Sequence, residues 1–125
     1  MGVGMPAAMH LEDFARKVRE AFPESVWLFH VGSSLKRKRG WRDVDVRLMM
    51  DEADYEAYGF GDPRYAQTNP RWCAMCMAFS ALGKQMTGLP IDFQIQQTSY
   101  ANEKFPGAGN RSAIGHFHLI ERDNG

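Results

Sequence analysis

The feature that most constrains the fold is a period of two between apolar and polar residues in residues 89–97. Ile91, Phe93 and Ile95 fall on one side of an extended chain there, and Asp92 falls on the other side. Because successive side chains of a β-strand point to opposite faces of the sheet, this pattern predicts a strand with one buried face and one polar face. Such a strand needs neighbouring strands and a covering layer, so we expect a sheet with helices on its apolar face.

Residues 43–50 form a second predicted strand, and this strand carries two aspartates. Asp43 and Asp45 project from the same face, whereas Val44 and Val46 project from the opposite face. If this strand lies beside the strand at 89–97, Asp92 joins the pair and three carboxylates converge. Carboxylates this close repel each other strongly unless a cation compensates them. Hard oxygen ligands with room for water and phosphate oxygens favour Mg²⁺, so the three aspartates are candidate metal ligands.

The remaining elements follow from apolar spacing and from the positions of glycine and proline. Apolar residues at helical spacing predict helices over 11–22 and 71–86. Further predicted elements are a strand at 25–31, a helical turn at 51–58 and a short last strand at 114–120. Residues 59–70 and most of residues 98–111 are predicted to be loop.

The chain has 125 residues, which suits one domain. We expect a flexible N-terminal tail over residues 1–10 and a single domain over 11–125. The elements together predict an α/β fold with a small mixed β-sheet of three to four strands and helices packed on one face. The helices at 11–22 and 71–86 are expected to form that covering layer.

Charge and cysteine usage narrow the class of protein. The 15 Lys and Arg residues balance the 15 Asp and Glu residues, so no global basic field indicates a nucleic-acid-binding protein. Two cysteines do not form a disulfide framework, which favours reduced thiols. No signal peptide is recognisable, and the apolar run at 26–29 is too short to span a bilayer. We therefore expect a cytoplasmic protein.

A glycine-serine turn precedes the two aspartates. Gly32 lets the main chain approach a ligand closely, and the N–H groups of Ser33 and Ser34 can donate to phosphate oxygens at the start of a short helix. Arg42 and Lys84 are further candidates for binding those phosphates. Two metal ions beside such a turn can hold the attacking oxygen and the leaving pyrophosphate in line.

These residues together resemble a known family. Gly32-Ser33, nine intervening residues, Asp43-Val44-Asp45-Val46 and a distant Asp92 in "LPIDFQI" are similar to the motifs of the DNA polymerase beta-like nucleotidyltransferase superfamily. The chain looks most like the minimal nucleotidyltransferases, and the resemblance covers roughly residues 25–97. Asp-X-Asp alone is weak evidence, whereas the turn, the spacing and the third aspartate together are more specific.

The resemblance implies a two-metal, Asp-dependent enzyme. Such an enzyme transfers a nucleoside monophosphate from a nucleoside triphosphate to a hydroxyl and releases pyrophosphate. By resemblance, Asp43 and Asp45 hold the nucleotide-associated metal, Asp92 completes the second metal site, and Gly32 and Ser33 touch the triphosphate. The metals are expected to be two Mg²⁺ ions, with Mn²⁺ as an alternative. The acceptor could be RNA, a protein or a small molecule. The chain could also form a homodimer or bind a partner protein.

Three other interpretations remain open. The chain could be a non-catalytic binding module with the same fold, such as an antitoxin-like partner protein. Asp43 and Asp45 could instead form ion pairs with Arg37, Arg39 or Arg42. A sugar-nucleotide transferase also uses Asp-X-Asp with a metal, but the short strand-turn-strand segment before the motif counts against that class.

A zinc site is the alternative for the two cysteines. Cys73 and Cys76 lie three residues apart in an apolar helical segment, and His116 and His118 follow near the end of the chain. The His-X-His spacing is a poor match to the usual zinc ligand spacing. We therefore interpret both cysteines as core residues.

Overall fold

The structure is a computed structural model, and it describes residues 6–22, 26–31, 43–104 and 112–115. At its centre is a four-stranded sheet with the strand order β3-β2-β1-β4. The strands are β1 (Trp27–Val31), β2 (Val44–Met50), β3 (Ile91–Gln97) and β4 (Ser112–Ile114). β2 and β3 are parallel, whereas β1 pairs antiparallel with both β2 and β4. The predicted small mixed α/β fold is therefore confirmed.

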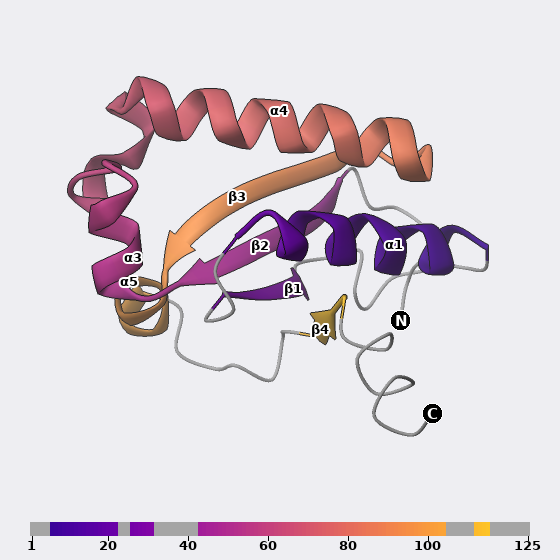
Figure 1. Cartoon of the computed structure of the whole chain (residues 1–125), viewed down its shortest axis with the longest axis horizontal. Helices are drawn as coiled ribbons and strands as arrows, with labels where there is room; N and C mark the ends of the chain where they lie inside the picture. Colours follow the sequence, from indigo (N-terminus) through magenta and orange to yellow (C-terminus); the bar gives the residue numbers. More distant parts are fainter. Residues whose placement is uncertain (1–5, 23–25, 32–42, 105–111, 116–125) are drawn as a thin grey trace.

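Two long helices, α1 (Ala7–Glu20) and α4 (Pro70–Thr87), cover one face of this sheet (Figure 1). α1 buries Leu11, Phe14 and Val18 against it. The strand residues that share this core are Leu28, Val44, Val46, Leu48, Ile91, Phe93 and Ile95. The period of two in β2 and β3 thus places their apolar side chains under the helices and their polar side chains on the opposite face.

Gly83 sets how closely α4 approaches the sheet. A Cβ atom at this position would lie 2.9 Å from the Ile91 Cγ1 atom and 3.0 Å from the Phe14 ring. Both separations are shorter than ordinary van der Waals contact, so a larger residue would push α4 away from β3 and α1. The helix begins after Asn69, whose side chain accepts a hydrogen bond from the Trp72 N–H, and ends at Gly88 in the left-handed conformation.

Three short helical segments gather near the end of the sheet where β2 and β3 finish (Figure 1). They are α3 (Glu52–Ala57), the 3-10 helix η1 (Pro63–Thr68) and α5 (Thr98–Lys104). The Asp51 side chain caps α3 by accepting a hydrogen bond from the Asp54 N–H at 2.8 Å. Among the helices that the structure describes, none is long and apolar enough to cross a membrane.

Four segments differ from the sequence prediction. The last strand was predicted at 114–120, but β4 spans Ser112–Ile114, and residues 116–120 lie outside the described residues. Residues 98–104 form α5 although loop was predicted, because Thr98 Oγ1 donates to the Met50 carbonyl at 3.1 Å and ties this segment to the end of β2. Residues 7–10 were predicted to belong to a flexible tail, but α1 begins at Ala7 because alanine and methionine extend the helix beyond its apolar stripe. The predicted loop at 59–70 contains η1.

The free edge of β3 is covered by one stripe of α4 side chains. Trp72 Nε1 donates to the Ile95 carbonyl at 2.8 Å and Ser80 Oγ accepts from the Phe93 N–H at 2.9 Å, and the buried Cys76 lies between these two residues on the helix. These α4 residues are spaced by four and therefore share one helix face. The stripe satisfies main-chain groups that an edge strand would otherwise offer to another chain.

The position of Cys76 on this stripe of α4 explains why its side chain is buried. Its side chain is buried in the core, as predicted, and burial raises the pKa of its thiol to about 11. Cys73 is half-buried and its Sγ atom donates to the Gln67 carbonyl at 3.3 Å. His116 and His118, the other residues of the zinc alternative, lie outside the described residues.

Candidate metal centre

Parallel pairing of β2 and β3 brings the predicted aspartates together. Asp45 lies directly opposite Asp92 in the register of the two strands. Both residues are half-buried and alternate with fully buried apolar neighbours, so they project from the face that α1 and α4 leave uncovered. Asp43 lies just before β2 and is exposed. The expected convergence therefore depends on one pairing, that of Asp45 with Asp92.

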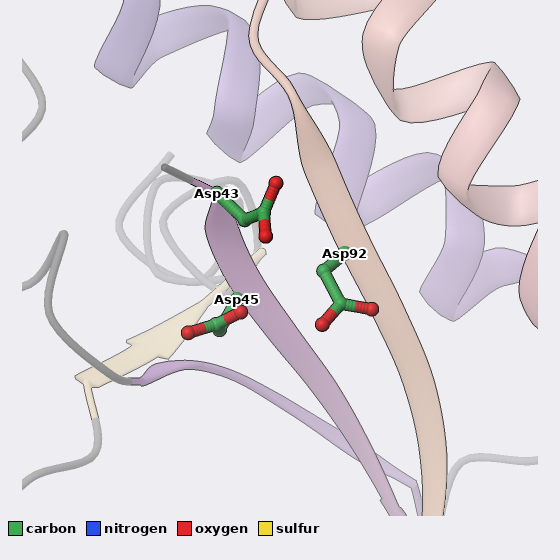
Figure 2. Close-up of side chains that lie close together, drawn as sticks. All are labelled: Asp43, Asp45 and Asp92. Atoms are coloured by element: carbon green, nitrogen blue, oxygen red, sulfur yellow. The ribbon is translucent and has the colours of Figure 1, made fainter. Parts of the chain in front are cut away.

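The three carboxyl groups are close enough to share a cation. Each of Asp43, Asp45 and Asp92 offers one oxygen, and these oxygens all lie within 4.8 Å of one another. Figure 2 shows Asp43 and Asp45 projecting from the start of β2 and Asp92 from the start of β3. The geometric prediction made from the sequence, that all three carboxylates lie on one sheet face within reach of one cation, is confirmed.

Arg47 is a fourth member of the cluster and was not predicted from the sequence. One guanidinium nitrogen donates to the main-chain carbonyls of Asp92 at 2.7 Å and Val46 at 3.1 Å. The other lies 3.4 Å from Asp92 Oδ2 and 3.8 Å from Asp45 Oδ1. The signal was present in the sequence, because Arg47 follows Asp45 by two positions and a strand places such residues on one face.

The charges of the cluster do not cancel. Three ionised carboxylates and one guanidinium leave a net charge of −2. Burial raises the pKa of the Asp45 carboxyl, Arg47 lowers it, and the neighbouring carboxylates of Asp92 and Asp43 raise it again. The net result is a raised pKa, and burial is its largest cause. A divalent cation would supply the missing positive charge.

The donor set fits a hard divalent metal ion. Ligand oxygens lie about 2.0–2.1 Å from Mg²⁺, so two oxygens of one ion are at most about 4.2 Å apart. The observed upper limit of 4.8 Å exceeds this value slightly, and a small rotation of the side chains removes the difference. Asp43 is exposed, so water and phosphate oxygens have room to complete the coordination.

The other predicted site residues have different outcomes. Gly32, Ser33, Ser34 and Arg42 lie outside the described residues, so their predicted contacts with phosphate stay predictions. The same holds for Arg37 and Arg39, the alternative partners of the aspartates. Lys84 is exposed in the last turn of α4, a helix on the other face of the sheet. Among the described contacts, no hydrogen bond or ion pair joins Lys84 to the carboxylates.

In comparisons with protein-family models, curated proteins and solved structures, none matches this chain.

Proposed function

We propose that the protein is a metal-dependent nucleotidyltransferase. It would transfer a nucleoside monophosphate from a nucleoside triphosphate to a hydroxyl and release pyrophosphate. The observation that supports this proposal is the convergence of Asp43, Asp45 and Asp92 on one open sheet face, with oxygens within 4.8 Å of one another. A structural sheet gains nothing from gathering three carboxylates, because each adds repulsion. The motif that includes the Gly32-Ser33 turn adds the resemblance to nucleotidyltransferases.

The side chains divide the work by position. Asp43 and Asp45 would hold the metal that accompanies the triphosphate. Asp92 comes from the neighbouring strand and would orient the acceptor hydroxyl and accept its proton. Bound Mg²⁺ would neutralise charge that develops on the phosphate oxygens. Arg47 holds the Asp92 main chain and lies near its carboxylate, so it would keep this group aligned before substrate binds.

A second candidate is a non-catalytic module that binds nucleotide on the same face. The observation that favours it is Arg47, because a guanidinium beside Asp92 and Asp45 partly compensates the cluster without any metal. A binding module needs Asp43 and Asp45 but not Asp92. The two candidates therefore differ in what the loss of Asp92 does.

The test is a transfer assay with each of the four labelled nucleoside triphosphates, Mg²⁺ or Mn²⁺, and RNA, protein and small hydroxyl acceptors. We expect label on one acceptor, and we expect Asp92→Asn to lower the rate at least about a hundredfold, the scale of losing one acid–base group. Nucleotide affinity should change less than about tenfold, a difference of roughly 1.4 kcal/mol. Asp13→Asn is the matched control, because Asp13 is an exposed aspartate on α1.

Two results would contradict the enzyme. Nucleotide binding without transfer to any acceptor would favour the binding module. Equal activity of Asp92→Asn and Asp13→Asn would show that Asp92 has no role in transfer. The resemblance to nucleotidyltransferases would then rest on Asp43 and Asp45 alone.

A further inference from the structure

A second polar feature lies at the other end of β3. A pocket with a volume of about 270 Å³ is bounded by residues of η1, α5 and the second half of β3. Gln94 and Gln96 line it, and both project from the same face of β3 as Asp92. At about 3.3 Å per residue, the step from Asp92 to Gln96 spans about 13 Å. Figure 1 shows β3 running from the end of α4 toward α5, so the pocket and the carboxylates lie at opposite ends of the strand.

The size and walls of the pocket suit a flat ring. The volume of about 270 Å³ lies just below the range of about 300–1,000 Å³ that is usual for small-molecule pockets, so it suits one ring system rather than a whole nucleoside triphosphate. Tyr100 of α5 and Trp72 of α4 supply aromatic surface, and Ala66 and Ala101 supply small apolar surface. The Trp72 Nε1 atom already donates to the Ile95 carbonyl, so its ring is held in place. Rigid aromatic and small apolar walls favour a planar ligand.

The polar groups of the pocket suit the edge of such a ring. The side chains of Gln94 and Gln96 are half-buried, and neither makes a hydrogen bond to another described residue. A glutamine amide offers two donors and an acceptor at once. Nucleobases present donors and acceptors side by side on their edges, and glutamine pairs with adenine in this way. Two adjacent amides are therefore suited to a base rather than to a hydrocarbon ring.

A cation lies at the rim for a phosphate. Lys104 follows Tyr100 by one helical turn of α5 and is exposed. Arg64 on the η1 side is already bound to Asp62 by an ion pair of 2.7 Å. Within the described part of the chain no ion pair engages Lys104. Lys104 is thus the cation available to a phosphate attached to the ring.

We propose that this pocket binds a nucleobase, with its ring against Tyr100, its edge hydrogen-bonded to Gln94 and Gln96, and its phosphate beside Lys104. The identity of the molecule that carries the base rests on the proposed function. The base belongs either to the nucleoside triphosphate or to a nucleotide of the acceptor. The chemistry of recognition is the same in both cases, and it does not require a metal ion.

The test is an NMR titration of the full chain with AMP, CMP, GMP and UMP. EDTA is present, so that no metal ion can hold a phosphate at the carboxylate cluster. We expect the amide signals of residues 94–97 and 100–104 to shift for at least one of these monophosphates, and those of residues 43–45 to stay unchanged. Gln96→Ala and Tyr100→Ala should weaken binding at least about tenfold. Gln96→Glu retains the shape of the side chain and should weaken binding as well, which separates recognition from misfolding.

A control variant and two competing ligands test whether binding requires a nucleobase. Gln85→Ala, which changes an exposed glutamine of α4, should bind like the wild type. Absence of binding by all four monophosphates would overturn the proposal. Ribose 5-phosphate binding as tightly as AMP would also overturn it, because Lys104 alone would then explain the affinity. An acidic peptide that displaces the monophosphate equally well would do the same.

Two further titrations identify the carrier. If ATP with Mg²⁺ shifts the pocket and residues 43–45 at the same concentration, the base is that of the triphosphate. If a trinucleotide in EDTA fills the pocket and ATP with Mg²⁺ leaves it free, the base is that of the acceptor. The first titration contains no metal, so its result does not depend on catalysis. A negative transfer assay would therefore not contradict the nucleobase pocket, and absence of binding in the pocket would not contradict the proposed nucleotidyltransferase.

Discussion

Among the single residues, Arg47 compensates the charge of the three aspartates only in part. The guanidinium makes its shortest hydrogen bond, 2.7 Å, to a main-chain carbonyl rather than to a carboxylate. Its distances to Asp92 and Asp45 are 3.4 and 3.8 Å. Arg47 therefore links β2 to β3 and compensates the carboxylates weakly. This combination suits a site that stays folded without metal and still binds one.

Substitution of Asp45 separates repulsion from structure. We expect Asp45→Asn to unfold in EDTA at the same temperature as the wild type or higher, because the substitution removes a repelled, half-buried carboxylate. Stabilisation by Mg²⁺ or Mn²⁺ should disappear in the same variant. Thermal melts with and without metal measure both effects, with Asp13→Asn as the control. A variant that melts well below the wild type in EDTA would identify Asp45 as a structural partner of Arg47.

Substitution of Arg47 should have the opposite signature. Arg47→Met removes the hydrogen bonds to Asp92 and leaves the carboxylates without a cation, so we expect a loss of about 1–3 kcal/mol of unfolding free energy in EDTA. Metal should restore more stability to this variant than to the wild type, because the competing cation is gone. Urea unfolding at several metal concentrations measures the difference. Equal stabilisation of both proteins by metal would show that the ion binds away from Arg47.

At the scale of elements, α4 acts as a cover for the edge of β3. Ser80→Ala leaves the Phe93 N–H without its partner, and a buried donor without a partner costs about 1–3 kcal/mol. We expect a loss of stability in this range in urea unfolding and faster hydrogen exchange of the Phe93 amide. Ser99→Ala is the control, because the exposed Ser99 hydroxyl donates to the Gln97 side chain and to no other residue in the described part of the chain. Its loss should stay within about 0.5 kcal/mol. Equal losses in both variants would contradict the edge-covering role of Ser80.

For the whole molecule, we expect His30 to make the free energy of unfolding depend on pH. This residue pairs with Val46 in β1 and β2, lies on the helix-covered face and is fully buried. Burial lowers its pKa from 6.5 to about 4. Below pH 6.5 the unfolded chain binds a proton that the folded chain does not, so stability falls until the folded histidine is protonated near pH 4. The full effect is about 3 kcal/mol at 1.36 kcal/mol per pH unit.

The measurement compares unfolding free energies of the wild type and His30→Phe between pH 7 and pH 4. The wild type should lose about 3 kcal/mol more than the variant across this interval. The carboxylates titrate in both proteins, so their contribution cancels in the difference between the two unfolding free energies. Identical pH dependence would mean that the folded protein admits a protonated His30.

The features that could be predicted from the sequence are those that depend on neighbouring residues in the chain. The period of two in residues 89–97 and 43–50 assigns each side chain to a face, because neighbouring side chains in a strand point in opposite directions. The helices predicted at 11–22 and 71–86 follow from apolar spacing and from Gly88, and the structure has them at 7–20 and 70–87. These signals were enough to predict the fold class and to select Asp43, Asp45 and Asp92.

How these elements meet depends on packing between segments that are far apart in the sequence. Asp92 reaches Asp45 because β3 pairs parallel with β2 in one register, and a register depends on packing across the sheet rather than on either strand alone. The same is true of α5, which Thr98 ties to β2, and of the stripe from Trp72 to Ser80, whose partners are main-chain groups of β3. Main-chain partners leave no pattern in a sequence. Arg47 joined the aspartates for both reasons: a local period placed it on their face, and its strongest contact is a carbonyl that only the neighbouring strand supplies.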